Sequence, residues 1–247
     1  MATKNYKIEI ATSDFATTKA AVEGGADRIE LCANLFEGGT TPSYGTIQLC
    51  REKFSVDLFP IIRPRGGDFL YSDEEFEIML RDVRFCKQTG CDGVVIGLLQ
   101  RDGTLDKERT ALLIKSAYPL SVSFHRAFDR CKDPFQTMEE LIELGCERIL
   151  TSGQQPVAEK GIELIAALQK EANGKIIIMP GSGVKVSNIQ LLAQRTGCME
   201  FHASLRRKEK SMMDFMHPSF ENDEESYRNN YIDSEEVRKL KEIINNG

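Results

Sequence analysis

Eight short apolar runs, separated by longer segments with helical periodicity, constrain the fold of this 247-residue chain more than any other feature. The runs are rich in Ile, Val, Leu and Phe, which is typical of strands buried on both faces of a parallel sheet. They are Tyr6–Ala11, Asp27–Leu31, Leu58–Arg63, Gly93–Gly97, Leu120–His125, Arg148–Thr151, Lys175–Met179 and Met199–Ala203. This alternation predicts an α/β fold made of eight strand–helix units.

A recurring turn sequence favours closing these strands into a (β/α)8 TIM barrel. Glycine followed by a small residue precedes strands two, four, six and eight, at Gly25, Gly90, Gly145 and Gly197. The alternative is an open doubly wound sheet, which calls for a glycine-rich phosphate turn after the first strand. The chain has Ala-Thr-Ser-Asp there, at 11–14. We therefore predict one TIM-barrel domain over residues 1–247, with a long mobile loop over 206–232 before the last helix.

Composition excludes several classes of partner and location. The formal net charge is −6 and the sequence shows no basic face, which argues against nucleic acid and anionic membranes. No window approaches the roughly 20 apolar residues that span a bilayer, and Met1–Lys7 lacks the apolar core of a signal peptide. Seven cysteines without a CxxC pair indicate reduced thiols. The sequence therefore predicts a cytoplasmic protein.

Charged and histidine side chains lie within or at the ends of the predicted strands, where burial is costly unless they are paired or used. Because TIM barrels gather functional residues at the C-terminal ends of their strands, we expect these side chains to meet at the mouth. We assign His125 as a general acid or base, and the glutamates as a second base or as ligands of a hard divalent metal. The candidate catalytic residues are Glu9, Glu30, His125, Glu200 and His202. A purely structural ion-pair network at the barrel top is the alternative.

A second set of residues predicts a site for an anion. Guanidinium groups suit carboxylate and phosphate, and glycines after strand seven let backbone N–H groups approach such a ligand. The candidate anion-binding residues are Arg63, Arg65, Arg126, Ser152, Gly181, Ser182 and Gly183. Two other interpretations remain open: the glycines form only a tight turn, and Arg63 only neutralises Glu30.

Two cysteines are expected near the mouth, whereas the others fall at strand starts or on helices. Cys32 and Cys131 are the candidate ligands for a soft metal, and the alternative for each is an inert buried thiol.

The chain resembles the CutC-type copper homeostasis family. The matching segments are GGADRIELC (24–32), EGGTTPSYG (37–45), IRPRGGDFLYS (62–72), FHRAFD (124–129), RILTSG (148–153), MPGSGV (179–184) and EFHAS (200–204). The resemblance implies a cytoplasmic TIM barrel that forms homo-oligomers, dimers or higher, and a role in copper handling. It also implies Cu(I) as a ligand of cysteine in some relatives. This chain departs from the family at Ala11, where relatives often carry a second cysteine.

Three functions therefore compete. The resemblance favours a copper-handling protein that binds Cu(I) near Cys32, with help from Cys131, His125 or His202. The residues favour an enzyme of isomerase, epimerase, aldolase or hydrolase type, acting on a small anionic or phosphorylated metabolite. A non-catalytic sensor or scaffold is the third interpretation, and unused buried charge argues against it.

Overall fold

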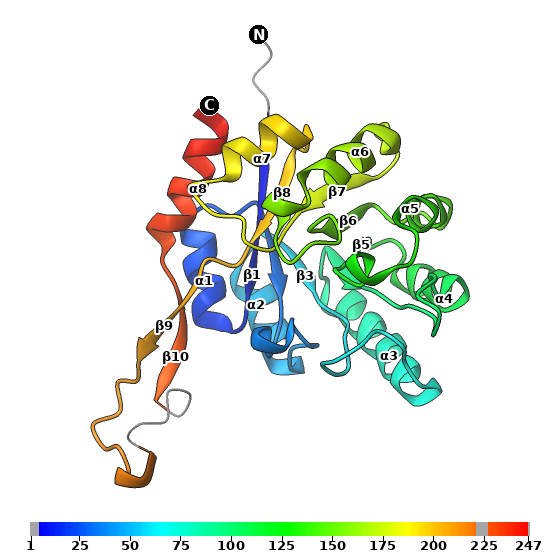
Figure 1. Ribbon diagram of the computed structural model, residues 1–247. Coiled ribbons are helices and arrows are strands. Elements are labelled where there is room, and N and C mark those ends of the chain that lie inside the picture. The colour runs from blue at the N-terminus through cyan, green and yellow to red at the C-terminus, as the bar shows by residue number, and fades with distance from the viewer. Residues whose placement is uncertain (1–4, 221–226, 247) are drawn as a thin grey trace.

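Eight parallel strands form the centre of the molecule, as a computed structural model covering residues 5–220 and 227–246 shows (Figure 1). All eight predicted strands are confirmed, with small shifts at their ends. They are β1 (Lys7–Thr12), β2 (Arg28–Leu31), β3 (Asp57–Pro60), β4 (Gly93–Ile96), β5 (Ser121–Phe124), β6 (Arg148–Thr151), β7 (Ile177–Pro180) and β8 (Glu200–Ala203). The TIM-barrel prediction is confirmed.

A helix follows each strand and packs on the outside of the barrel (Figure 1). Several helices begin where side chains can satisfy the free N–H groups of the first turn. Ser72 and Glu75 form a reciprocal capping box, and Asp133 caps a helix whose first residue is Pro134. The helices are α1 (Phe15–Glu23), α2 (Tyr44–Lys53), α3 (Asp73–Thr89), α4 (Lys107–Ala117), α5 (Pro134–Glu143), α6 (Ile162–Ala172), α7 (Ile189–Thr196) and α8 (Ser234–Asn246).

The barrel consists of two four-stranded parallel sheets, with strand orders β3-β2-β1-β8 and β4-β5-β6-β7. At the seam between β3 and β4, the N–H of Ile62 donates to the carbonyl of Val95 over 2.8 Å, next to an isolated bridge between Ile61 and Val95. No ladder joins β7 to β8 in the described part of the chain.

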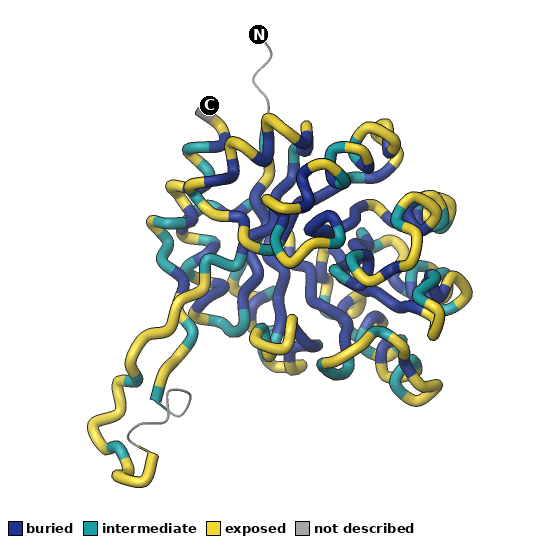
Figure 2. Tube along the Cα trace, viewed as in Figure 1, coloured by how far each residue is buried: buried dark blue, intermediate teal, exposed yellow. Residues whose placement is uncertain are grey.

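Alternation along the strands separates the outer core from the barrel interior. Ile8 and Ile10 of β1 belong to the large apolar cluster that includes the inner faces of the helices. Glu9, between them, points the other way, and the strand register places it beside Arg28 of β2 and His202 of β8. The buried strands and the exposed outer turns of the helices are clear in Figure 2.

The segment 206–232 differs from the prediction of a loop, because both of its ends are strands. β9 (Arg206–Lys210) and β10 (Arg228–Ile232) pair antiparallel and form an arm that extends away from the barrel (Figure 1). The arm is mostly exposed (Figure 2), so it carries no apolar periodicity from which a strand could be predicted. Residues 221–226 of this segment lie outside the described residues, as do residues 1–4 of the predicted polar N-terminus.

Among the described helices, none combines the length and the apolar character that crossing a membrane requires.

Candidate functional site

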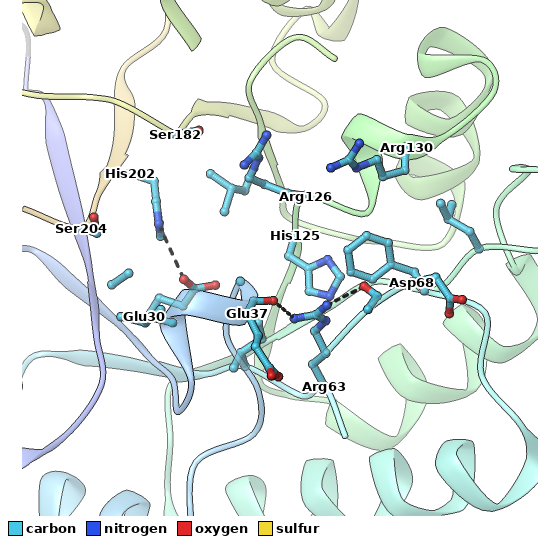
Figure 3. Close-up of a pocket in the computed structure, with 18 of the residues that line it drawn as sticks. Glu30, Glu37, Arg63, Asp68, His125, Arg126, Arg130, Ser182, His202 and Ser204 are labelled. Carbon is cyan, nitrogen blue, oxygen red and sulfur yellow. Dashed lines mark hydrogen bonds and ion pairs between the residues drawn. The ribbon is translucent and has the colours of Figure 1, made fainter. Parts of the chain in front are cut away.

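A cavity of about 820 Å³ opens at the C-terminal ends of the strands (Figure 3). Charged and imidazole groups enter it from several βα loops and from the ends of β2, β5 and β8. Five arginines, three carboxylates and two histidines line it: Arg63, Arg101, Arg126, Arg130, Arg206, Glu30, Glu37, Asp68, His125 and His202. No thiol lines the cavity.

Glu30 and His202 form the wall contributed by β2 and β8. The imidazole of His202 lies between two carboxylates, with its Nδ1 2.7 Å from Glu9 Oε1 and its Nε2 3.7 Å from Glu30 Oε2. Burial alone would lower the pKa of His202, but Glu30 and Glu9 outweigh it and raise that pKa. Burial raises the pKa of Glu30 to about 7, against the opposing effect of His202. Glu30 therefore titrates near neutral pH while facing the cavity.

Glu9 and Glu200, which we predicted at the mouth, lie deeper and do not line the cavity. Arg28 holds both: its Nε donates to Glu9 and its Nη2 donates to Glu200 over 2.7 Å. Arg148 Nε also donates to Glu200, over 3.3 Å. Burial would raise the pKa of Glu9, but Arg28 and His202 keep that pKa below its ordinary range. These two glutamates therefore belong to a buried ionic cluster made of Glu9, Arg28, Arg148 and Glu200.

Sequence reasoning missed Arg28 and Arg148, the cations of this ionic cluster. The signal was available for Arg28, because pairing β1 with β2 in register sets it directly beside Glu9. Arg148 opens β6 and reaches Glu200 across the β7–β8 seam, a contact that requires the closed barrel.

His125 lies at the end of β5 with its ring buried at the floor of the cavity (Figure 3). The backbone N–H of Ala127 donates to Nδ1 over 3.0 Å, and the ring of Phe69 lies 5.0 Å away, centroid to centroid. Burial and the charge of Arg63 lower the pKa of His125 to about 3. The lowered pKa favours a neutral ring at physiological pH, and the general acid or base role of His125 stays a prediction.

Arg63 lines the cavity as predicted, but its guanidinium is held by backbone. It donates to the carbonyls of Glu37, Gly39 and Gly67, over 2.8, 2.7 and 2.7 Å respectively. Within the described part of the chain it makes no ion pair with Glu30, so the interpretation that it neutralises Glu30 is wrong. Its charge thus remains without a carboxylate partner beside the cavity.

The other predicted anion-binding residues divide between the cavity and its support. Arg126, Ser182 and Gly183 line the cavity. Ser152 lies behind Arg126, where its hydroxyl accepts from the guanidinium over 2.8 Å. Gly181 packs so close that an added Cβ would lie 2.3 Å from the side chain of Leu150.

Arg65 does not reach the cavity, contrary to the prediction. Its guanidinium turns outward to the carboxylates of Glu75 and Asp68, over 2.6 and 3.1 Å. Sequence reasoning instead missed Arg101, Arg130 and Arg206, which line the rim and have no ion-pair partner among the described residues. Arg101 lies in a turn, Arg130 ends a short 3-10 helix and Arg206 opens the exposed strand β9, so none of them falls in an apolar run that marks a barrel strand.

The thiols do not fit a Cu(I) centre. Cys32 packs with Phe59, Ile61 and Val95 in the barrel interior, whereas Cys131 belongs to the outer apolar cluster. Burial, with Glu30 nearby, raises the pKa of Cys32 well above its ordinary value, which disfavours the thiolate that a soft metal needs. The described residues also contain no group of three or more His, Cys, Asp or Glu side chains placed to hold a metal ion.

Comparison with known proteins finds relatives that carry the same family name. The profile described as the CutC family matches residues 6–207. A CutC family protein of Chromobacterium violaceum is 50% identical over 206 residues, covering 83% of each chain. The human copper homeostasis protein cutC homolog is 45% identical over 218 residues, covering 88% of this chain and 80% of the human protein.

Solved structures agree on the fold. The CutC structure from Streptococcus agalactiae superposes with a TM-score of 0.77 at 33% identity, covering 81% of this chain and 98% of that one. Phosphoribosylanthranilate isomerase from Pyrococcus furiosus has a TM-score of 0.58 at 11% identity, covering 98% and 100%, and this likeness concerns the fold alone.

Proposed function

The chain belongs to the CutC family, and we propose that it serves copper homeostasis, the role for which its human relative is named, through an enzyme-like site for a small anionic metabolite. The observation that carries this proposal is the lining of the cavity, where five arginines face three carboxylates and no thiol. Cu(I) prefers thiolate and thioether ligands, so this lining suits a negatively charged organic ligand better than copper itself.

The placement of the charges supports binding of an anion. Arg63 is buried and forms no ion pair with a carboxylate among the described residues. The low-dielectric wall of the cavity strengthens the electrostatic field of this charge, which favours a negatively charged ligand. Arg126 is held at its Nε by Asp129 over 2.7 Å, which orients the guanidinium at the wall before a ligand arrives. A cavity of about 820 Å³ has the size of a small-molecule site.

We place this function in the cytoplasm. All seven cysteines are unpaired and buried, which supports a reducing environment.

Calorimetric titration with inorganic phosphate and with citrate tests the anion site. We expect Arg126→Met to weaken binding about tenfold or more, because a charge-assisted hydrogen bond is lost. The matched control is Arg81→Met, which removes an exposed arginine on α3 that pairs with Glu77 in its own helix. Equal affinity in all three proteins, or no binding of either anion, would contradict the proposal.

Copper tolerance of cells lacking this chain tests the link to copper. We expect growth on copper to be restored by the wild type and by Cys32→Ser, and not by Arg126→Met. Rescue that depends on Cys32 and not on Arg126 would assign the role to a thiol centre and overturn the anion site.

A further inference from the structure

We propose that the mouth of the barrel transfers a proton at a carbon next to a carbonyl group, with Glu30 taking the proton and His125 donating a hydrogen bond to the carbonyl oxygen. This inference rests on the proposed function, since the substrate class it names is a small ketone or aldehyde that carries a phosphate or carboxylate group. It assigns separate tasks to the two walls of the cavity.

The hydrogen bonding of His125 fixes which of its nitrogens carries the proton. Nδ1 accepts the N–H of Ala127, so a neutral ring has its hydrogen on Nε2. Gly97 packs against the same edge of the ring, because a Cβ there would lie 2.2 Å from Cε1 and 2.3 Å from Nδ1. Because Nδ1 is engaged with the backbone and packed against Gly97, the neutral imidazole presents Nε2–H to a ligand as a donor.

That donor has no acceptor among the residues that the structure describes. Nε2 of His125 is buried and makes no hydrogen bond to any described residue. Buried polar groups are nearly always paired, and an exception at the floor of a cavity points to a ligand atom that completes it. The atom must be an acceptor, and an oxygen that gains negative charge during a reaction benefits most from a fixed donor in a dry site.

The opposite wall supplies a base. Glu30 faces the cavity with His202 3.7 Å away, and Glu9 holds the far side of that imidazole at 2.7 Å. Glu9 is itself paired with Arg28, which keeps it ionised, whereas Glu30 makes no ion pair with an arginine among the described residues. Burial raises the pKa of Glu30 to about 7, which suits proton transfer near neutral pH.

The arginines provide for the anionic end of the substrate. Arg126 and Arg130 line the cavity, and Figure 3 shows Arg130 on the far side of His125 from Glu30. An anion bound there leaves the rest of a small molecule between His125 and Glu30.

The step balances without a metal or a redox partner. The carboxylate of Glu30 takes the proton from carbon, and the C–H electron pair becomes a carbon–carbon double bond. The π pair of the carbonyl moves to oxygen, and this enolate oxygen accepts the hydrogen bond from Nε2 of His125. Return of the proton from Glu30 to carbon restores the carboxylate and the carbonyl. In D2O the protonated carboxyl of Glu30 first exchanges its hydrogen with solvent, so the returned atom is deuterium.

Deuterium exchange followed by proton NMR tests the inference. The full-length protein is incubated in D2O with dihydroxyacetone phosphate or with 2-oxobutyrate, which distinguishes a phosphate from a carboxylate as the anionic group. We expect loss of the C–H signal next to the carbonyl of at least one probe. Glycerol 3-phosphate, which lacks the carbonyl, controls for binding without exchange.

Variants separate the two tasks. We expect Glu30→Gln to slow exchange about 100-fold or more, and Glu30→Asp to slow it less, because the shorter acid keeps the base. We expect His125→Phe to cost about 100-fold, and His125→Gln to recover part of this loss by restoring a donor. Glu52→Gln, on the exposed face of α2, is the matched control and leaves exchange unchanged.

The pH profile gives a readout that a structural role of Glu30 would not produce. The groups that face Glu30 are His202 on β8, Glu9 on β1, Arg28 on β2 and the Cys32 thiol. Exchange rises with pH as the carboxylate forms and levels off above about 7, and this inflection disappears in Glu30→Gln.

The two levels of the proposal fail differently. Binding of the probes by calorimetry without exchange in any of them overturns proton transfer and leaves the anion site standing. Absence of binding by every phosphate and carboxylate probe overturns the proposed function as well. Exchange that survives Glu30→Gln assigns the base to another residue and overturns the inference.

Discussion

Two buried glutamates on adjacent strands have pKa values shifted in opposite directions, and their contacts with Arg28 differ. Arg28 forms an ion pair with Glu9, whereas Glu30 forms no ion pair with an arginine among the described residues, and burial dominates its pKa. Glu9 therefore remains ionised, whereas the charge of Glu30 is costly near neutral pH. Burial of this kind, maintained at the expense of stability, is typical of functional sites.

The first prediction concerns the stability of Glu30→Gln. A carboxyl group whose pKa is about 7 when folded and 4.5 when unfolded holds its proton more tightly in the folded chain, so stability falls as pH rises from 4.5 to 7. Glutamine shows no such fall. We expect the free energy of unfolding of the variant, relative to the wild type, to increase by up to about 3 kcal/mol across this range.

Urea unfolding at pH 5 and pH 8 measures this difference. If the free energy of unfolding of the variant, relative to the wild type, stays constant or decreases from pH 5 to pH 8, the raised pKa of Glu30 is contradicted.

The second prediction concerns Arg28→Met. Removal of the cation leaves Glu9 and Glu200 buried with reduced compensation, which costs about 3–5 kcal/mol of unfolding free energy. The control is Arg238→Met, whose exposed pair with Glu235 lies within one turn of α8, and we expect it to change stability little. Equal losses in the two variants would show that the ionic cluster does not stabilise the barrel.

Individual residues also show how much of the site can be predicted from the sequence. Strand alternation correctly places Glu30 and His202 on the inner surface, because a period of two needs no tertiary information. It does not give the depth of a side chain along the barrel axis, and so Glu9 and Glu200 are predicted at the mouth although they lie below it. Depth depends on the stagger between strands, which only the closed barrel determines.

Among the elements, the arm formed by β9 and β10 differs most from what the sequence predicts. The barrel strands are predicted well because their apolar runs are dictated by burial. The arm is held by backbone hydrogen bonds between two exposed strands, and any sequence without proline can make them. Its attachment to the barrel depends on few side chains, chiefly Ile232 and Asn230, whose amide donates to the hydroxyl of Ser13 over 3.1 Å.

The third prediction therefore concerns two adjacent residues of β10. Ile232 is 1% exposed and Tyr231 is 39% exposed. We expect Ile232→Ala to lower the free energy of unfolding by about 2–4 kcal/mol, because it leaves a cavity at the base of the arm. We expect Tyr231→Ala to change it by about 0.5 kcal/mol. Chemical denaturation measures both, and a similar loss in each would mean that the arm is anchored along its length.

At the scale of the whole molecule, the barrel consists of two four-stranded sheets, and different interactions join them at their two seams. Backbone hydrogen bonds cross the seam between β3 and β4, whereas Arg148 and Glu200 reach across the seam between β7 and β8. The ring of Phe59 fills the interior between the guanidinium groups of Arg28 and Arg148, which lie 5.3 and 5.2 Å from its centroid. The fold class was predictable from strand count and repeats, but this division was not, because it arises from contacts between distant strands.

The fourth prediction tests the packing around Phe59. A Cβ on Gly93 would lie 2.2 Å from that ring, so Gly93→Ala forces the aromatic side chain to move. We expect a loss of about 1–3 kcal/mol in the free energy of unfolding, as in other overpacked cores. The matched control is Gly45→Ala in α2, where no atom lies within 4 Å and alanine favours the helix by about 0.5–1 kcal/mol. Stabilisation in both variants would show that the interior adapts without cost.

The fixed hydrogen-bonding role of His125 has a stereochemical consequence. Because this imidazole is a donor and the arginines keep their protons, we assign both the removal and the return of the proton to Glu30, the cavity carboxyl whose pKa is about 7. Removal and return then occur on the same face of the planar enolate. In a methylene group next to the carbonyl, deuterium would replace one of the two prochiral hydrogens and spare the other, and the labelled carbon would have a single configuration.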